Sequence, residues 1–305
     1  MKMLFDAKLP TKILRLVSNF LDNRFGHVKV NEHLSMKVPL TAGVPQGSFL
    51  SPLLYIFFIR GLPTKISEEV MSSFYADDIC YAASDTSHKR RSTFAATHLQ
   101  EILNKLELFC SKWRIKLNPD KTIVLNTYNK KENDNTPRLW LRGELLKYEK
   151  SCKFLGVTFD SNHNFIEHVN DIVTRAKKRL NLLKALRGQS WDASPQTILY
   201  SYRTYVRPLL EYSCILFSHS RDSLLKQIQA VETQAIKIAF RLAPWATNTS
   251  CYNLVTFPRI LDRLKTLSKN FLQQNKSDEL IKPLIEESKM SISGQHSSIY
   301  KVLNF

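Results

Sequence analysis

The spacing of apolar residues predicts short strands and helices in the first half of the chain. Between residues 9 and 24, apolar side chains recur every three or four positions, which is typical of an amphipathic helix. Residues 25–40 read as two short strands with a turn near 31–32. Ser51 and Pro52 have the residue types of a helix cap and a first helical position. We therefore expect a helix there, with a buried face made by Leu53, Leu54, Phe57 and Phe58.

The middle of the chain continues this mixture. The pattern of residues 87–113 predicts a helix that packs on a sheet. Residues 115–127 read as a strand that is interrupted by a turn, and residues 128–137 as an exposed polar loop. A tight hairpin is expected over 139–148, and a single strand over 152–159.

From residue 166 the pattern becomes helical. Residues 166–187 carry one apolar side, which predicts an amphipathic helix. We expect a second helix from Ser194, disturbed at Pro208, a third capped by Asp222, and a fourth from Pro258 to about residue 274. The Ser-rich segment 289–305 is expected to be disordered.

Adjacent carboxylates stand out in the segment 72–83. Asp77 and Asp78 lie between two short, aromatic, β-prone arms, which predicts a β-hairpin with the pair at its turn. Asp is an ordinary turn residue, so the pair alone is also explained by the turn. However, two like charges at the tip of an apolar hairpin are costly unless something neutralises them. Mg²⁺, which binds one or two carboxylates together with substrate phosphates, would do so.

The net charge of the chain indicates which class of molecule it binds. Lys and Arg outnumber Asp and Glu by 44 to 27 in the 305 residues, which gives a formal net charge of +17. Such an excess indicates a polyanion, either nucleic acid or an anionic membrane. No apolar stretch is long enough to span a bilayer, and the N-terminus lacks a signal-peptide core. The five scattered cysteines indicate reduced thiols in an intracellular protein without a zinc site, in the nucleus or the cytoplasm.

Four short motifs together resemble one family. The segment 74–78, Phe-Tyr-Ala-Asp-Asp, resembles the Tyr-x-Asp-Asp motif of reverse transcriptases. The segment 42–54 resembles that family's Gly-Val-Pro-Gln-Gly run before a helix, and 117–122 and 154–157 resemble its next two motifs in family order. The sequences of these motifs are most similar to those of the jockey-like branch of non-LTR retrotransposons.

The resemblance implies an α+β fold with a polymerase-type palm. Residues 1–160 would be partial fingers and palm, and 161–288 a helical thumb and extension. Catalysis would rest on Asp77 and Asp78, which would hold Mg²⁺ or Mn²⁺, and on Lys121, which would stabilise charge or protonate the pyrophosphate. Alternatively, Lys121 is a turn lysine that is exposed to solvent and has no catalytic role.

The resemblance also assigns residues that touch substrates. The implied partners are an RNA template, a DNA primer and deoxynucleoside triphosphates. Template and nucleotide would lie against Pro45, Gln46, Gly47 and Tyr75. The end of the primer would be held by a primer grip made by the backbone of Phe154, Leu155 and Gly156, a segment that could also be a plain sheet edge.

A basic helix face is the remaining candidate for binding. It carries Arg175, Lys177, Lys178 and Arg179. Basic helix faces are usually solvated, but beside a palm this one could follow the phosphates of a nucleic acid.

The first catalytic Asp of the family has no clear counterpart. Asp6 stands too close before Gly43 for the family's layout, so we expect the chain to begin inside the polymerase domain, with an incomplete metal site and no activity alone. Two hypotheses follow: a reverse transcriptase fragment from a retroelement, or a non-catalytic nucleic-acid-binding protein on a reused palm-thumb scaffold. Primer extension discriminates between them.

Overall fold

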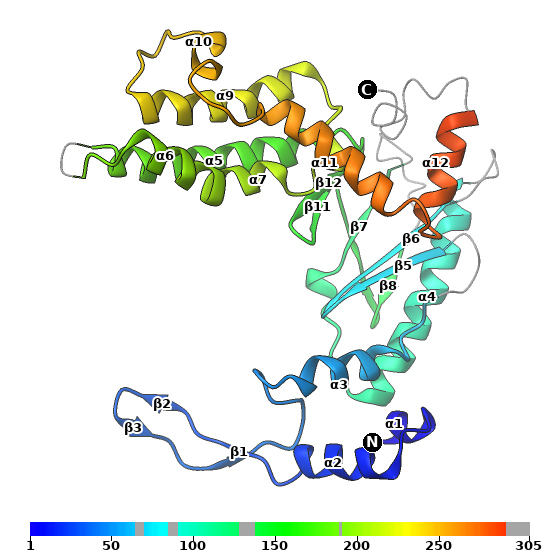
Figure 1. The fold of residues 1–305 in the computed structure, drawn as a ribbon. Helices are drawn as coiled ribbons and strands as arrows, with labels where there is room; N and C mark the ends of the chain where they lie inside the picture. The colour runs from blue at the N-terminus through cyan, green and yellow to red at the C-terminus, as the bar shows by residue number, and fades with distance from the viewer. Residues whose placement is uncertain (65–69, 85–90, 128–137, 189–190, 291–305) are drawn as a thin grey trace. The chain divides into compact units, whose positions relative to one another are not determined.

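The computed structural model describes residues 1–64, 70–84, 91–127, 138–188 and 191–290, and in these it divides into two compact units. The first unit comprises residues 1–123 and 132–147. The second comprises residues 124–131 and 148–305. The two are described separately below (Figure 1).

Three helices pack together at the start of the first unit. They are α1 (Lys2–Asp6), α2 (Thr11–Leu21) and α3 (Leu50–Ile59). Leu4, Val17 and Leu54 form a small core between them. The helix predicted over residues 9–24 is confirmed as α2.

A narrow ribbon of four two-residue strands lies between α2 and α3 in the sequence. The strand β1 (Phe25–Gly26) pairs with β4 (Val38–Pro39), and β2 (Lys29–Val30) pairs with β3 (His33–Leu34). The two predicted strands are therefore confirmed in outline, each broken in two. Most of the ribbon's apolar side chains are exposed because no second layer of described residues covers them.

The start of α3 differs from the prediction. The helix is capped by Phe49, and Ser51 is its second residue. The Ser51 hydroxyl donates to the carbonyl of Pro45 instead of capping the helix. Leu54 is buried, but Leu53 is 57% exposed, so the predicted inward face was wrong at that position.

A β-hairpin with a helix against it completes the centre of the first unit. The strands β5 (Val70–Tyr75) and β6 (Asp78–Ala83) pair antiparallel, and α4 (Arg91–Trp113) packs against β6 (Figure 1). The apolar stripe of α4 buries Ile102 and Leu106, as its spacing predicted.

Short elements follow α4. A 3₁₀ turn, η1, spans Pro119–Lys121. The strand β7 (Ile123–Leu125) pairs with β10 (Lys147–Glu149), and β8 (Trp140–Leu141) pairs with β9 (Glu144–Leu145). The tight hairpin predicted over 139–148 is confirmed in β8 and β9. The loop predicted over 128–137 lies outside the described residues.

The second unit begins with a hairpin where the sequence predicted one strand. The strands β11 (Ser151–Phe154) and β12 (Val157–Asp160) pair antiparallel. Leu155 and Gly156 reverse the chain with φ of +47° and +81°. Leucine rarely adopts this conformation, so the composition of the segment gave no turn signal.

Helices make up the rest of the second unit. They are α5 (Ile166–Leu186), α6 (Pro195–Ser201), the π-helical turn η2 (Tyr202–Val206), α7 (Arg207–Glu211), α8 (Cys214–Phe217), α9 (Asp222–Phe240), α10 (Asn248–Tyr252), α11 (Ile260–Gln274) and α12 (Ile281–Met290). The long helices α5 and α9 pack together around one core, and α6 packs on α9.

The helical predictions hold with shifts of a residue or two. Ser194 caps α6 as predicted, and the π-helical turn ends at Val206, two residues before Pro208, where a disturbance was expected. Asp222 is the first residue of α9 and Arg221 its cap, so the predicted cap was wrong. The fourth helix begins at Ile260, after Pro258. At the other end, residues 289–290 finish α12 in place of the predicted disorder, and 291–305 lie outside the described residues.

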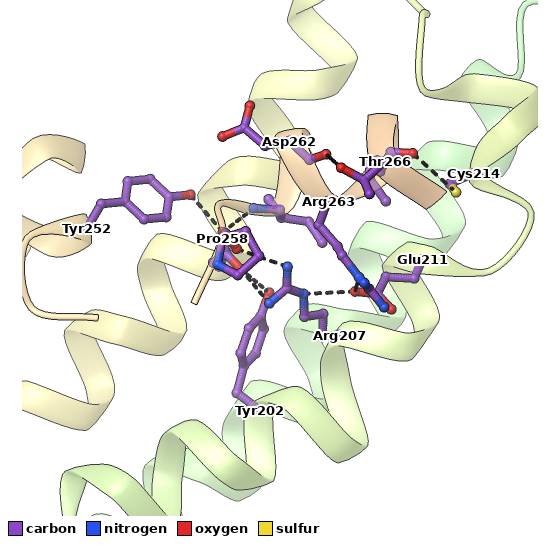
Figure 2. Close-up of polar contacts among 12 residues, drawn as sticks. Tyr202, Arg207, Glu211, Cys214, Tyr252, Pro258, Asp262, Arg263 and Thr266 are labelled. Atoms are coloured by element: carbon purple, nitrogen blue, oxygen red, sulfur yellow. Dashed lines mark hydrogen bonds and ion pairs between the residues drawn. The ribbon is translucent and has the colours of Figure 1, made fainter. Parts of the chain in front are cut away.

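A buried polar network joins the helices of the second unit (Figure 2). Glu232, fully buried on α9, accepts hydrogen bonds from the Tyr202 hydroxyl at 3.2 Å, the Tyr252 hydroxyl at 2.9 Å and the backbone N–H of Ile260 at 2.6 Å. Arg207, also buried, donates to the carbonyl of Pro258 at 3.0 Å and lies 2.9 Å from the Glu211 carboxylate. These bonds fix where α10 and α11 meet α7 and α9.

None of the helices in the described part of the chain combines the length and apolarity needed to cross a membrane.

Candidate functional site

The adjacent carboxylates lie at the tip of the β5–β6 hairpin. The ladder ends with Tyr75 opposite Asp78, which leaves Ala76 and Asp77 as a two-residue turn. Ala76 has a φ of +53°, in the left-handed region that tight hairpin turns require. Asp77 is therefore in the turn, and Asp78 opens β6. Both side chains are exposed.

No neighbouring group in the described part of the chain balances the charges of Asp77 and Asp78. Among the described residues, no hydrogen bond or ion pair to either carboxylate is found. The same residues contain no group of three His, Cys, Asp or Glu side chains that could hold a metal ion. The prediction that both residues lie in the turn was wrong for Asp78, which is the first residue of β6. Two adjacent carboxylates at one hairpin tip still fit a divalent cation that is shared with a phosphate ligand.

Tyr55 joins the hairpin tip to α3. Its hydroxyl donates to the backbone carbonyl of Ala76 at 3.0 Å. Burial, and after it the negative charge of Asp77, raises the pKa of the Tyr55 hydroxyl above its ordinary value, so this group stays protonated and can donate. The sequence reasoning missed Tyr55. Its one signal is that it is the only phenol in an apolar helix.

The glycine-containing loop before α3 borders a pocket of about 490 Å³. Tyr55 lines the same pocket, together with Pro45, Gln46 and Gly47. Gly47 has a φ of +89° and open space where a Cβ would stand, so a ligand can approach its backbone closely. Tyr55 of α3 therefore both lines this pocket and bonds to the hairpin tip. Tyr75, at the end of β5, is exposed.

Lys121 ends the 3₁₀ turn η1 and is exposed. The turn is held by Asn118, whose side-chain oxygen accepts from the N–H of Asp120 at 3.1 Å. Asp120 pairs with Lys147 at 3.5 Å. Within the described residues, no ion pair involves Lys121, and its role stays a prediction.

The remaining predicted groups belong to the second unit. Phe154, Leu155 and Gly156 form the tip of the β11–β12 hairpin, where the Leu155 carbonyl accepts from the Tyr212 hydroxyl at 2.7 Å. Tyr212 lies 57 positions after Leu155 in the sequence, and the sequence analysis did not identify this contact.

The basic residues of α5 are not equivalent. Lys177 and Lys178 are exposed, and no ion pair with a described residue is found for either. Arg175 pairs with Asp171 at 3.4 Å. Arg179 is partly buried: its guanidinium donates to the carbonyl of Tyr205 and lies 4.4 Å from the centre of that ring. Of the four predicted residues, the two lysines are thus the most available to a phosphate.

Comparisons with known proteins identify a family and several similar proteins. Residues 1–159 match the sequence model of the family described as reverse transcriptase (RNA-dependent DNA polymerase). The chain is 26% identical to the RNA-directed DNA polymerase from mobile element jockey of Drosophila melanogaster over 282 residues, which is 89% of this chain and 30% of that protein. It is 28% identical to the probable RNA-directed DNA polymerase from transposon BS of the same species, over 75% of this chain and 25% of that protein. The chain therefore spans less than a third of these relatives.

Proposed function

The chain belongs to the reverse transcriptase family, and on this premise we propose that it forms the palm and thumb portion of an RNA-directed DNA polymerase of the non-LTR retrotransposon type. The observation that carries the proposal is the hairpin tip: two adjacent, uncompensated carboxylates tied by Tyr55 to a loop that lines a pocket. The ligands would be an RNA template, a DNA primer and deoxynucleoside triphosphates.

Asp77 and Asp78 would hold Mg²⁺ or Mn²⁺. When bound, the ion would stabilise negative charge on the triphosphate. The residues of the chain have separate tasks. Tyr55 holds the Ala76 carbonyl and thereby fixes the direction of the turn that presents Asp77. Lys121 would supply positive charge or a proton to the leaving pyrophosphate.

Template and nucleotide would lie in the pocket beside Pro45, Gln46 and Gly47, with Tyr75 next to the carboxylates. The backbone of Gly47 is accessible there because no side chain covers it. In the second unit, the Phe154–Gly156 turn would hold the end of the primer, and the exposed lysines of α5 would contact phosphates without reading sequence.

The non-catalytic alternative, a nucleic-acid-binding protein on a reused scaffold, is not favoured, because relatives matched over most of the chain are described as polymerases. A binding experiment tests the proposal. The full chain is titrated with Mn²⁺ while the signal of free Mn²⁺ is followed by electron paramagnetic resonance, with a DNA primer on an RNA template present.

We expect Mn²⁺ binding by the wild-type chain and its loss in Asp77→Asn and Asp78→Asn. Asp22→Asn, which changes another exposed carboxylate of the first unit, is the matched control and should bind as the wild type does. Equal Mn²⁺ binding by all these chains, or no affinity for the primer–template, would contradict the proposal.

A further inference from the structure

The turn at the tip of the β11–β12 hairpin is held from outside by one tyrosine. The Tyr212 hydroxyl donates to the Leu155 carbonyl at 2.7 Å, and the Tyr212 ring would lie 3.5 Å from a Cβ added at Gly156. The ring therefore lies beside the glycine, and the hydroxyl bonds to the peptide that precedes it. Both contacts lie within the second unit.

The shape of this turn needs external support. Leu155 has a φ of +47°, a left-handed conformation that is unfavourable for a residue with a Cβ. Such conformations persist where the surroundings determine them. The bond from Tyr212 is made to the carbonyl of the strained residue itself, so it stabilises the conformation that the turn requires.

Tyr212 is itself well fixed. Its N–H donates to the Pro208 carbonyl at 3.1 Å, at the end of α7. The next residue, Ser213, lies 3.2 Å from Nε2 of the buried His168. His168 Nδ1 in turn accepts from the N–H of Thr158, on β12, at 3.3 Å. The hairpin is thus held at its tip by Tyr212 and along β12 by His168.

The position of the Leu155 carbonyl also sets the direction of the Gly156 N–H. The two groups belong to one planar trans peptide, so they point in opposite directions. Because the carbonyl is bonded to Tyr212, the N–H points away from Tyr212. This N–H belongs to Gly156, which is exposed and has no side chain of its own to block access. A backbone N–H in such a place suits a phosphate oxygen.

We propose that Tyr212 is a positioning residue that holds the Leu155–Gly156 peptide so that its N–H binds a backbone phosphate at the 3′ end of the primer strand. This inference rests on the proposed function, since it requires that the hairpin is the primer grip. Tyr212 acts through the peptide and not on the reacting atoms.

A site-specific cross-link tests it. A DNA primer carries an azidophenacyl group on its last internucleotide phosphorothioate and is annealed to an RNA template. The full wild-type chain, Tyr212→Phe and Tyr200→Phe are irradiated with it, and cross-linked peptides are mapped. Tyr200 is an exposed tyrosine of the same unit and serves as the matched control.

We expect the cross-link at residues 154–157 in the wild type and in Tyr200→Phe, and a roughly twofold to tenfold lower yield in Tyr212→Phe, the loss expected from one hydrogen bond. The midpoint of thermal unfolding should fall by only a few degrees, as expected for one lost hydrogen bond. The total affinity for the hybrid should change little, because the phosphate contacts of α5 remain. Gly156→Ala, which strains the turn at a φ of +81° but keeps the hydroxyl, should give a similar loss.

An unchanged yield in Tyr212→Phe would overturn the inference. A loss of yield that only parallels a loss of fold and of total affinity would overturn it too, since the hydroxyl would then act on folding alone. Hybrid binding by the wild type without any cross-link at 154–157 would instead remove the primer grip from the proposed function.

Discussion

The hydroxyl of Tyr55 donates a hydrogen bond to the backbone carbonyl of Ala76 over 3.0 Å, across 21 positions of sequence. Ala76 is the residue of the β5–β6 turn that has a positive φ. The helix that follows the pocket loop is therefore bonded to the most strained point of the turn that carries Asp77. The metal binding that we propose at the turn would therefore depend on this contact.

Tyr55→Phe should weaken Mn²⁺ binding a few-fold, because the lost hydrogen bond is worth about 0.5–1.5 kcal/mol and no longer restrains the turn. Tyr81→Phe is the matched control: the Tyr81 hydroxyl bonds to the Pro63 carbonyl at 2.9 Å from the same hairpin, away from its tip. That variant should lose stability but keep its affinity for Mn²⁺. Titrations with Mn²⁺ measure the affinity of each variant. Equal Mn²⁺ affinities of Tyr55→Phe and Tyr81→Phe would contradict the role given to Tyr55.

Residues 1–305 alone should bind a primer–template without extending it. Asp77 and Asp78 lie on one hairpin, and the described residues supply no group of three metal-binding side chains. Mg²⁺ demands near-octahedral coordination, so two carboxylates hold it weakly and leave the triphosphate poorly positioned. The measurement is extension of a DNA primer on an RNA template with Mg²⁺ or Mn²⁺. Extension that disappears in Asp6→Asn would refute this prediction and would place Asp6 in the metal site.

Replacing Lys177 and Lys178 together by Ala should weaken hybrid binding about equally for all sequences. Each phosphate contact contributes about 0.9 to the slope of log affinity against log salt for a duplex, so the slope should fall by about 2. Fluorescence anisotropy over a range of salt concentrations measures it. Lys226→Ala with Lys276→Ala removes the same charge from other exposed positions and should change the slope less. Equal slopes for the two double variants would show that α5 has no special part.

Glu232→Ala should destabilise the second unit by about 3–5 kcal/mol, because it leaves three buried donors without their acceptor and removes a carboxylate 3.9 Å from the buried Arg207 guanidinium. Urea unfolding measures the loss. Gln227→Ala, an exposed change on the same helix, should stay within about 0.5 kcal/mol of the wild type. Similar effects of the two changes would mean that the network in Figure 2 contributes little to stability.

Stability should fall in mild acid because of His168. Burial lowers the pKa of this imidazole below its ordinary 6.5. The negative charge of Asp171 partly offsets this effect, and the positive charges of Lys153 and Arg175 lower the pKa further. The unfolded chain then takes up a proton at a higher pH than the folded chain does. The free energy of unfolding therefore has its full His168 contribution above pH 6.5 and loses it as the pH falls from there towards the lowered pKa.

Urea unfolding at about pH 7.5 and about pH 5.5 tests this dependence. His168→Gln should lose less stability between these two values than the wild type does. The exposed His163→Gln should behave as the wild type, and a wild-type dependence in His168→Gln would assign the acid sensitivity to other groups.

Much of this fold is local, and the sequence predicts that part well. The stripe of α5, the β5–β6 hairpin and the Arg142–Gly143 turn follow from residue types within a few positions of one another. The predictions that failed concern residues whose contacts are not apparent from the neighbouring sequence. Ser51 does not cap α3 because its hydroxyl reaches back to Pro45, and Leu155 forms a turn that Tyr212 supports from 57 positions away. Neither Tyr55 nor Tyr212 has a local pattern that reveals its contact.

The attachment of β12 to the helices decides where this chain can be cut. The match to the family model ends at residue 159, yet Thr158 bonds to His168 and Leu155 bonds to Tyr212. A protein shortened to the matched region would contain both strands of this hairpin and neither of the side chains that hold it. The region that sequence comparison delimits is thus smaller than the piece that must fold together, and expression trials should keep at least residues 148–274 in one polypeptide, since α9 and α11 complete the core against which α5 packs.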